Sequence, residues 1–216
     1  MKRFVFILSF ALIMCTLISA GWTQDVHSGQ YAARLEWTNQ WVGGMDSGLD
    51  RQNSLIPIQG AHDYTFKAWV RSANSELDDV FDFRFADFTE SETHIADDAK
   101  PWTTTSNDWV RYSFTHTADT NTAFLNVAFR IVNTNGGAIV IDDVTLHDDT
   151  DSTTVTITNA GFEDWPGAEN DPPTDWRFFE VGGADGSITR IEATPTPTPT
   201  PIPGTAAKKE LWQPYQ

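Results

Sequence analysis

The stretch Ala138-Ile-Val-Ile-Asp-Asp-Val-Thr-Leu146 combines an apolar, β-branched run with two adjacent carboxylates. Such a short run predicts a buried β-strand, and Asn135-Gly-Gly137 directly before it predicts a hairpin turn, because asparagine and glycine accept positive φ. Two other segments are predicted to lie beside this strand: 27–35, near the N-terminus, and 159–165, near the C-terminus. We expect the three segments to form the edge of one β-sandwich.

The remainder of the chain consists of short alternating or apolar runs separated by Gly, Asn, Asp and Pro, without long runs of helical period. This pattern is typical of all-β proteins, and we predict an antiparallel β-sandwich of the jelly-roll type. The predicted strands are 30–37, 64–71, 80–86, 109–116, 123–132, 138–146, 154–158, 177–181 and 187–191.

Alternation predicts which side chains point away from the core, because successive residues of a strand face opposite sides of the sheet. In the predicted strand 64–71, Trp69 lies on the same side as two basic residues. In two further strands apolar residues occupy one side, and the other side carries Asp82, Arg84, Asn126 and Arg130. We expect Trp69 and these polar residues to share one outer face.

The charge of the chain limits its partners. A formal net charge of −16 argues against nucleic acid and anionic membranes, both of which require basic patches, and is compatible with neutral ligands and with calcium. A solvated acidic surface that keeps a secreted protein soluble also explains the charge.

The N-terminus predicts secretion. Residues 1–20 have the basic start, apolar centre and small-residue exit of a signal peptide, so we expect an extracellular protein whose mature chain begins at Gly21. The single cysteine, Cys15, falls inside this leader, so the mature chain would have neither disulfides nor thiolate metal sites. A lipoprotein signal is disfavoured because Met14 precedes Cys15 where a small residue is needed.

The C-terminus divides the remaining chain. Four Thr-Pro repeats followed by Ile-Pro predict an extended, polyproline-like linker over 193–203. We therefore expect the sandwich to span 21–192, and we expect 204–216 to be an unstructured tail, because it is too short to form a core.

Four motifs resemble the jelly-roll carbohydrate-binding modules found beside xylanases and glucanases, within the galactose-binding-like fold. Asn159-Ala-Gly-Phe-Glu-Asp-Trp165 with Pro173-Thr-Asp-Trp176 is similar to that family's opening strand. Val26-His-Ser-Gly-Gln-Tyr-Ala-Ala33 resembles an early element, and the segments 109–114 and 141–146 resemble the late and closing strands.

The order of these motifs differs from that of the family, because the opening motif comes last. One interpretation is a second module that the linker cuts short. The other is a circularly permuted single domain, which is favoured because 38 residues cannot bury a core and because sandwich termini lie close together. The permuted domain predicts backbone pairing of the segment 155–164 with the 139–146 side of the sheet.

The resemblance also implies a structural calcium ion. Matched by motif, its ligands would be Glu163, Asp142 and main-chain carbonyls around Ser28 and Gln30. Calcium prefers six to eight hard oxygen ligands, and carboxylates with backbone carbonyls supply them. The alternative is that both acids are solvated at strand ends.

Sugar binding is the function that the resemblance implies. Aromatic rings stack on the apolar faces of sugars, and nearby polar groups bind the hydroxyls. Trp69 is the first candidate platform and Trp41 the second, with polar contacts from Asp82, Arg84, Asn126 and Arg130. Alternatively, Trp69 packs in a second layer, and Arg130 or Arg84 forms a surface ion pair with Asp82.

Catalysis is not expected. Glu76-Leu-Asp78 is similar to the acidic strand of jelly-roll glycosidases, but Val80 and Phe81 occupy the positions that a second carboxylate would need. We therefore predict a secreted, non-catalytic module that binds polysaccharide or oligosaccharide, with a linked catalytic domain as a possible neighbour. The alternatives are a protein-interaction or adhesion module of a secreted assembly and an accessory fragment of a glycoside hydrolase.

Overall fold

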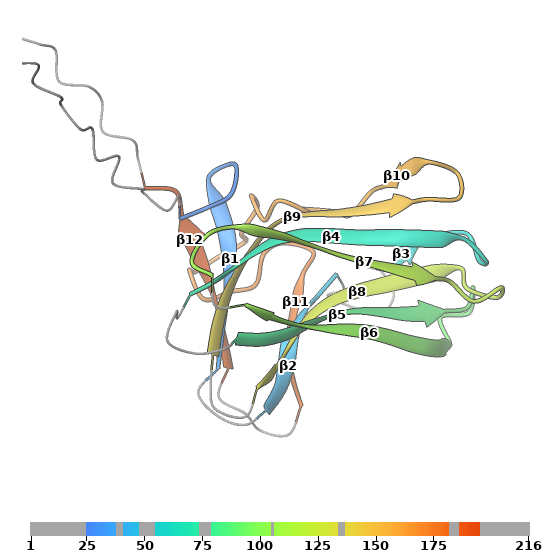
Figure 1. Ribbon diagram of the computed structural model, residues 1–216, viewed down its shortest axis with the longest axis horizontal. Helices are drawn as coiled ribbons and strands as arrows, with labels where there is room; N and C mark the ends of the chain where they lie inside the picture. The colour runs from blue at the N-terminus through green and yellow to red at the C-terminus, as the bar shows by residue number, and fades with distance from the viewer. Residues whose placement is uncertain are drawn as a thin grey trace, which may run out of the picture.

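Two antiparallel sheets pack face to face in the computed structural model (Figure 1), which describes residues 25–37, 41–47, 55–73, 79–104, 106–133, 137–181 and 186–194. These residues form no helix, so the prediction of an all-β sandwich is confirmed. None of them forms a helix long and apolar enough to cross a membrane.

Each sheet has six strands. Sheet A has the order β12 (Gly186–Glu192), β1 (Tyr31–Trp37), β9 (Gly137–Asp148), β4 (Asp63–Ser72) and β7 (Val110–Thr117), and β10 (Thr153–Val155) also pairs with β9. Sheet B has the order β11 (Arg177–Val181), β2 (Trp41–Asp46), β8 (Phe124–Asn133), β5 (Asp79–Phe88) and β6 (His94–Thr104), and β3 (Ile56–Pro57) also pairs with β8.

The core lies between the sheets and is rich in phenylalanine. Phe66 of β4 meets Phe83 of β5 edge to face, with ring centroids 5.1 Å apart, and Phe129 of β8 packs against both. All three side chains are fully buried. The alternation seen in the sequence therefore assigns the core-facing side of each of these strands correctly.

The two carboxylates of β9 are separated by a β-bulge. Trp69 of β4 pairs with Asp142, and Lys67 pairs with Thr145. Between these two pairs β9 contains one residue more than β4. Asp143 has a positive φ of 48°, as a bulged residue often does. Asp142 consequently lies on the outer side of sheet A, while Val144 returns to the core.

The C-terminal segment belongs to the same sandwich. β10 pairs with the end of β9, the Val144 N–H donates to the Ala160 carbonyl at 2.9 Å, and β11 and β12 form the outer strands of the two sheets. The predicted pairing with β9 is confirmed at Val155, but the following residues up to 164 form no strand. Trp176, fully buried against Phe129 and Phe162, fixes the segment to the core.

Three strands were not predicted: β2, β6 and the two-residue β3. β6 has largely exposed side chains and is an edge strand, so it lacks the apolar alternation that marks a strand in sequence. β2 contains Gly43-Gly44, and a Cβ at Gly44 would lie 1.8 Å from the Phe129 carbonyl oxygen of β8. Glycine is required by this close approach, although in sequence it indicates a loop.

The predicted signal peptide, most of the Thr-Pro linker and the tail lie outside the described residues.

Candidate functional site

Four of the predicted ligand-binding residues lie on sheet B. Arg130 of β8 is the cross-strand partner of Asp82 on β5, and its Nε and Nη2 donate to the two carboxylate oxygens of Asp82 at 2.8 and 2.6 Å. Arg84 of β5 pairs with Ala128, and Asn126 of β8 pairs with Ala86. Because Phe83 and Phe129 of the same strands face the core, these four residues lie on the outer face of sheet B.

Three more contacts with aspartates extend this surface across the sheet. Arg84 contacts Asp97 of β6 at 2.5 Å, and His94 contacts the other oxygen of Asp97 at 3.0 Å. Arg177 of β11 contacts Asp46 of β2. We call the surface formed by Arg84, Arg130 and Arg177 with Asp97, Asp82 and Asp46 the arginine face.

In two of its three arginine–aspartate pairs, the arginine face exposes the donor more than the acceptor; in the third, Asp97 is 38% exposed and Arg84 29%. The side chains of Arg130 and Arg177 are 23% and 44% exposed, whereas those of Asp82 and Asp46 are 7% and 5% exposed. Burial raises the pKa of Asp97, but Arg84 and His94 outweigh it and hold that pKa below its ordinary value. Asp97 therefore stays ionised beside Arg84, and each of the three guanidinium groups is fixed by a carboxylate, with N–H groups left for a ligand.

Small residues lie between these pairs, and one aromatic ring lies beside them. Gly44 and Ala128 occupy the centre of the sheet, next to Arg130 and Arg84 in the register. Phe179 of β11 pairs with Gly44, and the Arg177 guanidinium lies 5.8 Å from its ring centroid. Alternation in Arg177–Val181 could have identified Phe179, because Phe178 packs on the core and Phe179 follows it.

Trp69 does not share this surface, and the expectation of one common face is wrong. It belongs to sheet A, its neighbours in β4 face the core, and it therefore lies on the opposite outer side of the sandwich from Asp82, Arg84, Asn126 and Arg130. Alternation within one strand tells on which side of its own sheet each side chain lies. It does not tell to which of the two sheets the strand belongs. Trp41 begins β2 of sheet B and pairs with Asn133; its side chain lies outside the described residues.

The surroundings of Trp69 are those of a packing residue. His27 stacks on the indole with centroids 4.0 Å apart, and Arg111, the cross-strand partner on β7, lies 5.9 Å from the ring centroid. Trp109 meets His27 edge to face at 5.8 Å. The indole is half-buried and already has partners from the segment 25–30 and from β7.

His27 belongs to the N-terminal strap, which we define as residues 25–30. The strap crosses the outer face of sheet A and buries Val26 against Ala32 and Val140. The backbone N–H groups of His27 and Ser28 donate to Asp142 Oδ2 at 2.9 and 3.1 Å, and the Gln30 N–H donates to Glu163 at 3.0 Å.

The residues predicted to bind calcium lie around this strap, but Ser28 and Gln30 face Asp142 and Glu163 with their N–H groups and not with the predicted carbonyls. Asp142 is fully buried, and burial raises the pKa of its carboxyl group to about 7, against the N–H groups that lower it. Ser28 donates its hydroxyl to Asp143 at 2.8 Å. Gly29 has a φ of 66°, and a Cβ there would lie 1.8 Å from Glu163 Oε1, so the missing side chain makes room for that carboxylate.

The carboxylates and the Ser28 hydroxyl of this cluster are hard oxygen ligands of the kind that calcium prefers, whereas the Gln30 carbonyl already accepts the Ala193 N–H at 2.8 Å. A cation would also offset the charge of the buried Asp142 and its neighbours. The same carboxylates accept backbone N–H groups, so the strap is held by hydrogen bonds as well.

Another group with metal-ligand chemistry lies at the far end of β9. His62, Asp148 and Asp151 place one ligand atom each within 4.8 Å of one another. Burial raises the pKa of Asp148, but the Asp151 N–H and His62 outweigh it and lower the pKa. The Asp148 carboxylate accepts the N–H groups of Thr150 and Asp151 and contacts the His62 ring. These contacts therefore cap the turn that follows β9.

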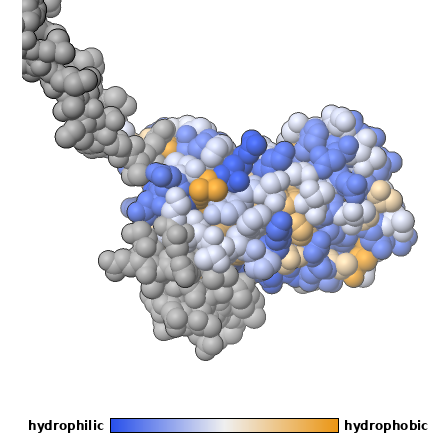
Figure 2. All heavy atoms as spheres, viewed as in Figure 1, coloured by the Kyte–Doolittle hydropathy of each residue, from blue (hydrophilic) through white to orange (hydrophobic). Residues whose placement is uncertain are grey.

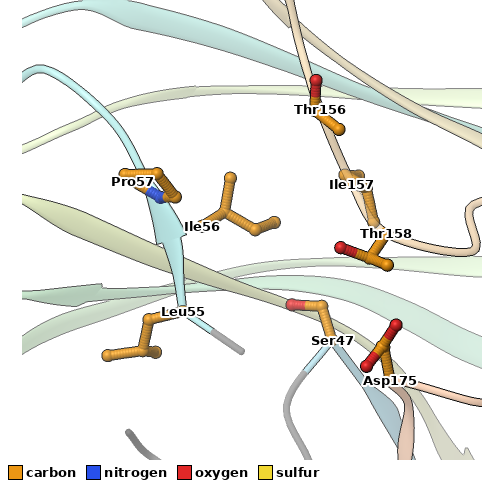
Figure 3. Close-up of a pocket in the computed structure, with 8 residues that line it drawn as sticks. All are labelled: Ser47, Leu55, Ile56, Pro57, Thr156, Ile157, Thr158 and Asp175. Atoms are coloured by element: carbon orange, nitrogen blue, oxygen red, sulfur yellow. The ribbon is translucent and has the colours of Figure 1, made fainter. Parts of the chain in front are cut away.

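One cavity of about 200 Å³ lies near β3, lined by Ser47, Leu55, Ile56, Pro57, Thr156, Ile157, Thr158 and Asp175. Figure 3 shows Ser47 and Asp175 close together at one end and the aliphatic Ile56 facing the 156–158 segment. The volume is below the roughly 300 Å³ of small-molecule sites, and no predicted site residue lines it.

The exposed surface of the described residues is mainly polar. Figure 2 shows a largely hydrophilic face with small apolar areas. Val110 is the large apolar side chain that is exposed among the described residues. Extended apolar patches mark protein-docking surfaces, and the described residues on the face in Figure 2 form only small ones.

Most of the solved structures that resemble this chain are carbohydrate-binding modules. The CBM22-1 and GH10 modules of an endo-1,4-β-D-xylanase from Clostridium thermocellum, complexed with xylohexaose, match 43% of this chain and 18% of that one, with 16% identity and a TM-score of 0.37. The CBM22-1 xylan-binding domain from Paenibacillus barcinonensis matches 52% and 70%, with 12% identity and a TM-score of 0.39.

A CBM61 module in complex with β-1,4-galactotriose matches 58% of this chain and 75% of its own, with 15% identity and a TM-score of 0.38. No family model matches the sequence, and no curated protein matches it. Likenesses this remote assign no ligand to this chain.

Proposed function

We propose that this protein is a secreted, non-catalytic carbohydrate-binding module that holds a polysaccharide on the arginine face. The observation that carries the proposal is the set of partly exposed guanidinium groups fixed by aspartates across sheet B. Arginine held in one orientation loses less conformational entropy when it binds, so its remaining N–H groups are preorganised for ligand oxygens.

A sugar fits this surface chemically. The small residues Gly44 and Ala128 leave space above the sheet, and Phe179 offers an apolar face beside the donors. Ligand sites combine an apolar surface with a few fixed polar groups in this way. The paired arginines carry no excess charge, and a chain of net charge −16 repels anions, so neutral glycans are favoured.

Calcium is proposed as a stabilising ion at Glu163, Asp142, Ser28 and Gln30, away from the sugar. This cluster lies on the sheet A side, so its role would be to hold the strap. The Thr-Pro segment is proposed as a spacer to a further module, such as a catalytic domain, and residues 1–20 as the signal peptide.

The test is binding of the mature chain, residues 21–216, to insoluble xylan, glucan and mannan. We expect at least one glycan to retain the protein, and we expect Arg84→Ala to weaken retention about 10-fold, the effect of losing one or two hydrogen bonds to a charged donor. Lys67→Ala, on the outer face of sheet A, is the matched control and should leave retention unchanged. Failure of every glycan would favour the protein-interaction module instead.

A further inference from the structure

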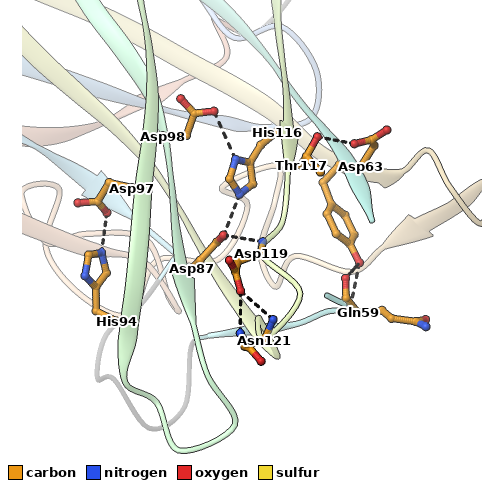
Figure 4. A network of polar contacts seen from close by, with 11 residues as sticks. Gln59, Asp63, Asp87, His94, Asp97, Asp98, His116, Thr117, Asp119 and Asn121 are labelled. Atoms are coloured by element: carbon orange, nitrogen blue, oxygen red, sulfur yellow. Dashed lines mark hydrogen bonds and ion pairs between the residues drawn. The ribbon is translucent and has the colours of Figure 1, made fainter. Parts of the chain in front are cut away.

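His116 joins the two sheets where they have no backbone pairing between them. It lies on β7, the edge strand of sheet A, and its side chain points between the layers toward Asp87 of β5 and Asp98 of β6, both in sheet B (Figure 4). Among the described strands β7 pairs only with β4 and β6 only with β5, so this side of the sandwich is closed by side chains.

Both ring nitrogens of His116 face carboxylates. Nε2 lies 2.9 Å from Asp87 Oδ1, and Nδ1 lies 3.4 Å from Asp98 Oδ2. A neutral imidazole has one N–H group and one lone pair, so one of these carboxylates would face a lone pair. The doubly protonated ring donates to both, and the geometry therefore selects the imidazolium.

The charge of His116 affects stability because the imidazole ring is buried. The side chains of His116 and Asp87 are 8% and 2% exposed, and the ring stacks on Phe85 with centroids 4.8 Å apart. The second oxygen of Asp87 accepts the Asp119 N–H at 3.1 Å. A buried carboxylate that loses its cation is costly, whereas Asp98 is half-exposed and can be hydrated.

The other titratable groups nearby do not replace this cation. Tyr64 is the cross-strand partner of His116 on β4, and burial raises the pKa of its hydroxyl to about 12, so it stays neutral. The Asp119 carboxylate accepts from Asn121, and Lys100 of β6 lies over the Trp102 ring at 4.4 Å. The groups that face His116 from each packed element are Asp87, Asp98, Tyr64 and the backbone of Asp119.

We propose that His116 is a proton-dependent clamp, whose imidazolium ties β7 of sheet A to β5 and β6 of sheet B and whose loss of a proton loosens this side of the sandwich. Burial alone lowers the pKa of the imidazole, but Asp87 and Asp98 outweigh it and raise the pKa above 6.5. The stabilisation is complete below pH 6.5 and is lost as the pH rises through the folded-state pKa. The clamp therefore holds in acid and opens in alkali.

Two measurements on the mature protein test this inference. In the NMR titration of the histidine Cε1–H resonances, with His116→Gln to assign the signal, we expect His116 to titrate above pH 6.5. In thermal unfolding from pH 6 to 9, we expect the wild-type Tm to fall by about 6–20 °C, the size of losing one buried ion pair in a domain of this length. His116→Gln should remove most of this slope.

His94→Gln is the matched control, because His94 also contacts an aspartate but is exposed, and it should keep the wild-type slope. A His116 resonance that titrates at or below pH 6.5 overturns the proposal, as does an unchanged slope in His116→Gln. If that variant does not fold, the wild-type titration decides alone, because each histidine can then be assigned by its through-space contacts, here those to Phe85.

Discussion

His27 lies flat against Trp69, with ring centroids 4.0 Å apart and ring planes 17° apart. The contact follows from the backbone, because the His27 N–H donates to Asp142, and Asp142 is the cross-strand partner of Trp69. One carboxylate of β9 therefore places the strap over the tryptophan of β4. Trp69 therefore anchors the strap, and the arginine face, where we propose that the ligand binds, lies on the other sheet.

Trp69→Ala is expected to lower stability and to leave glycan binding unchanged. Loss of a half-buried indole and its stacking should cost about 1–3 kcal/mol in the free energy of unfolding. Chemical denaturation measures this loss, with Lys67→Ala on the same side of β4 as the control. A Trp69→Ala protein of wild-type stability would contradict the packing role.

Gly29→Ala is expected to release the strap. The positive φ and the approach of Glu163 leave no space for a Cβ, so we expect a loss of about 1–3 kcal/mol in unfolding free energy. Gly161→Ala is the matched control in the same cluster, because its Cβ would meet atoms no nearer than 3.7 Å. Equal effects of the two substitutions would show that the approach of Glu163 to Gly29 is unimportant.

Calcium removal tests the proposed ion. If calcium binds at the strap, a chelator should lower the Tm by about 3–6 °C, because a ligand that binds only the folded state stabilises it. Glu163→Gln keeps an acceptor for the Gln30 N–H but removes the charge, so it should abolish the response to calcium. A melting curve that neither chelator nor added calcium changes would leave the strap held by hydrogen bonds alone.

Trp176→Ala tests whether the C-terminal segment is part of the core. The indole is fully buried against Phe129 and Phe162, so its loss should cost about 3–5 kcal/mol and reduce the cooperativity of unfolding. Asn170→Ala, exposed in the same segment, is the control. Unfolding of Trp176→Ala at the wild-type denaturant concentration would mean that 156–181 contributes little to the sandwich.

The sequence predicts the core strands because their apolar residues alternate. Phe81, Phe83 and Phe85 assign the core side of β5 without any knowledge of its neighbours. The alternation fails for β6, whose exposed edge has no apolar side, and for β2, where Gly44 is needed because β8 passes close to it. Contacts between strands, which a single strand does not encode, decide both cases.

The sequence motifs also predict that Ser28, Gln30, Asp142 and Glu163 lie in one region. In the structure Ser28 contacts Asp142, and Gln30 contacts Glu163, through their N–H groups. The arginine face is only partly predicted. Asp82 and Arg130 are identified by parity, but Asp46 and Arg177 come from strands whose pairing no local pattern specifies. The assignment of Trp69 to that face fails for the same reason, because strand order across two sheets is a long-range property.

The most direct test of the proposed function is the affinity of one retained glycan for three variants, two on sheet B and one on sheet A, measured by affinity electrophoresis. The arginine face predicts that Arg84→Ala and Phe179→Ala each weaken binding about 10-fold. It also predicts that Trp69→Ala binds as the wild type does. Loss of binding in Trp69→Ala, with both sheet B variants unaffected, would contradict the account and place the ligand on sheet A.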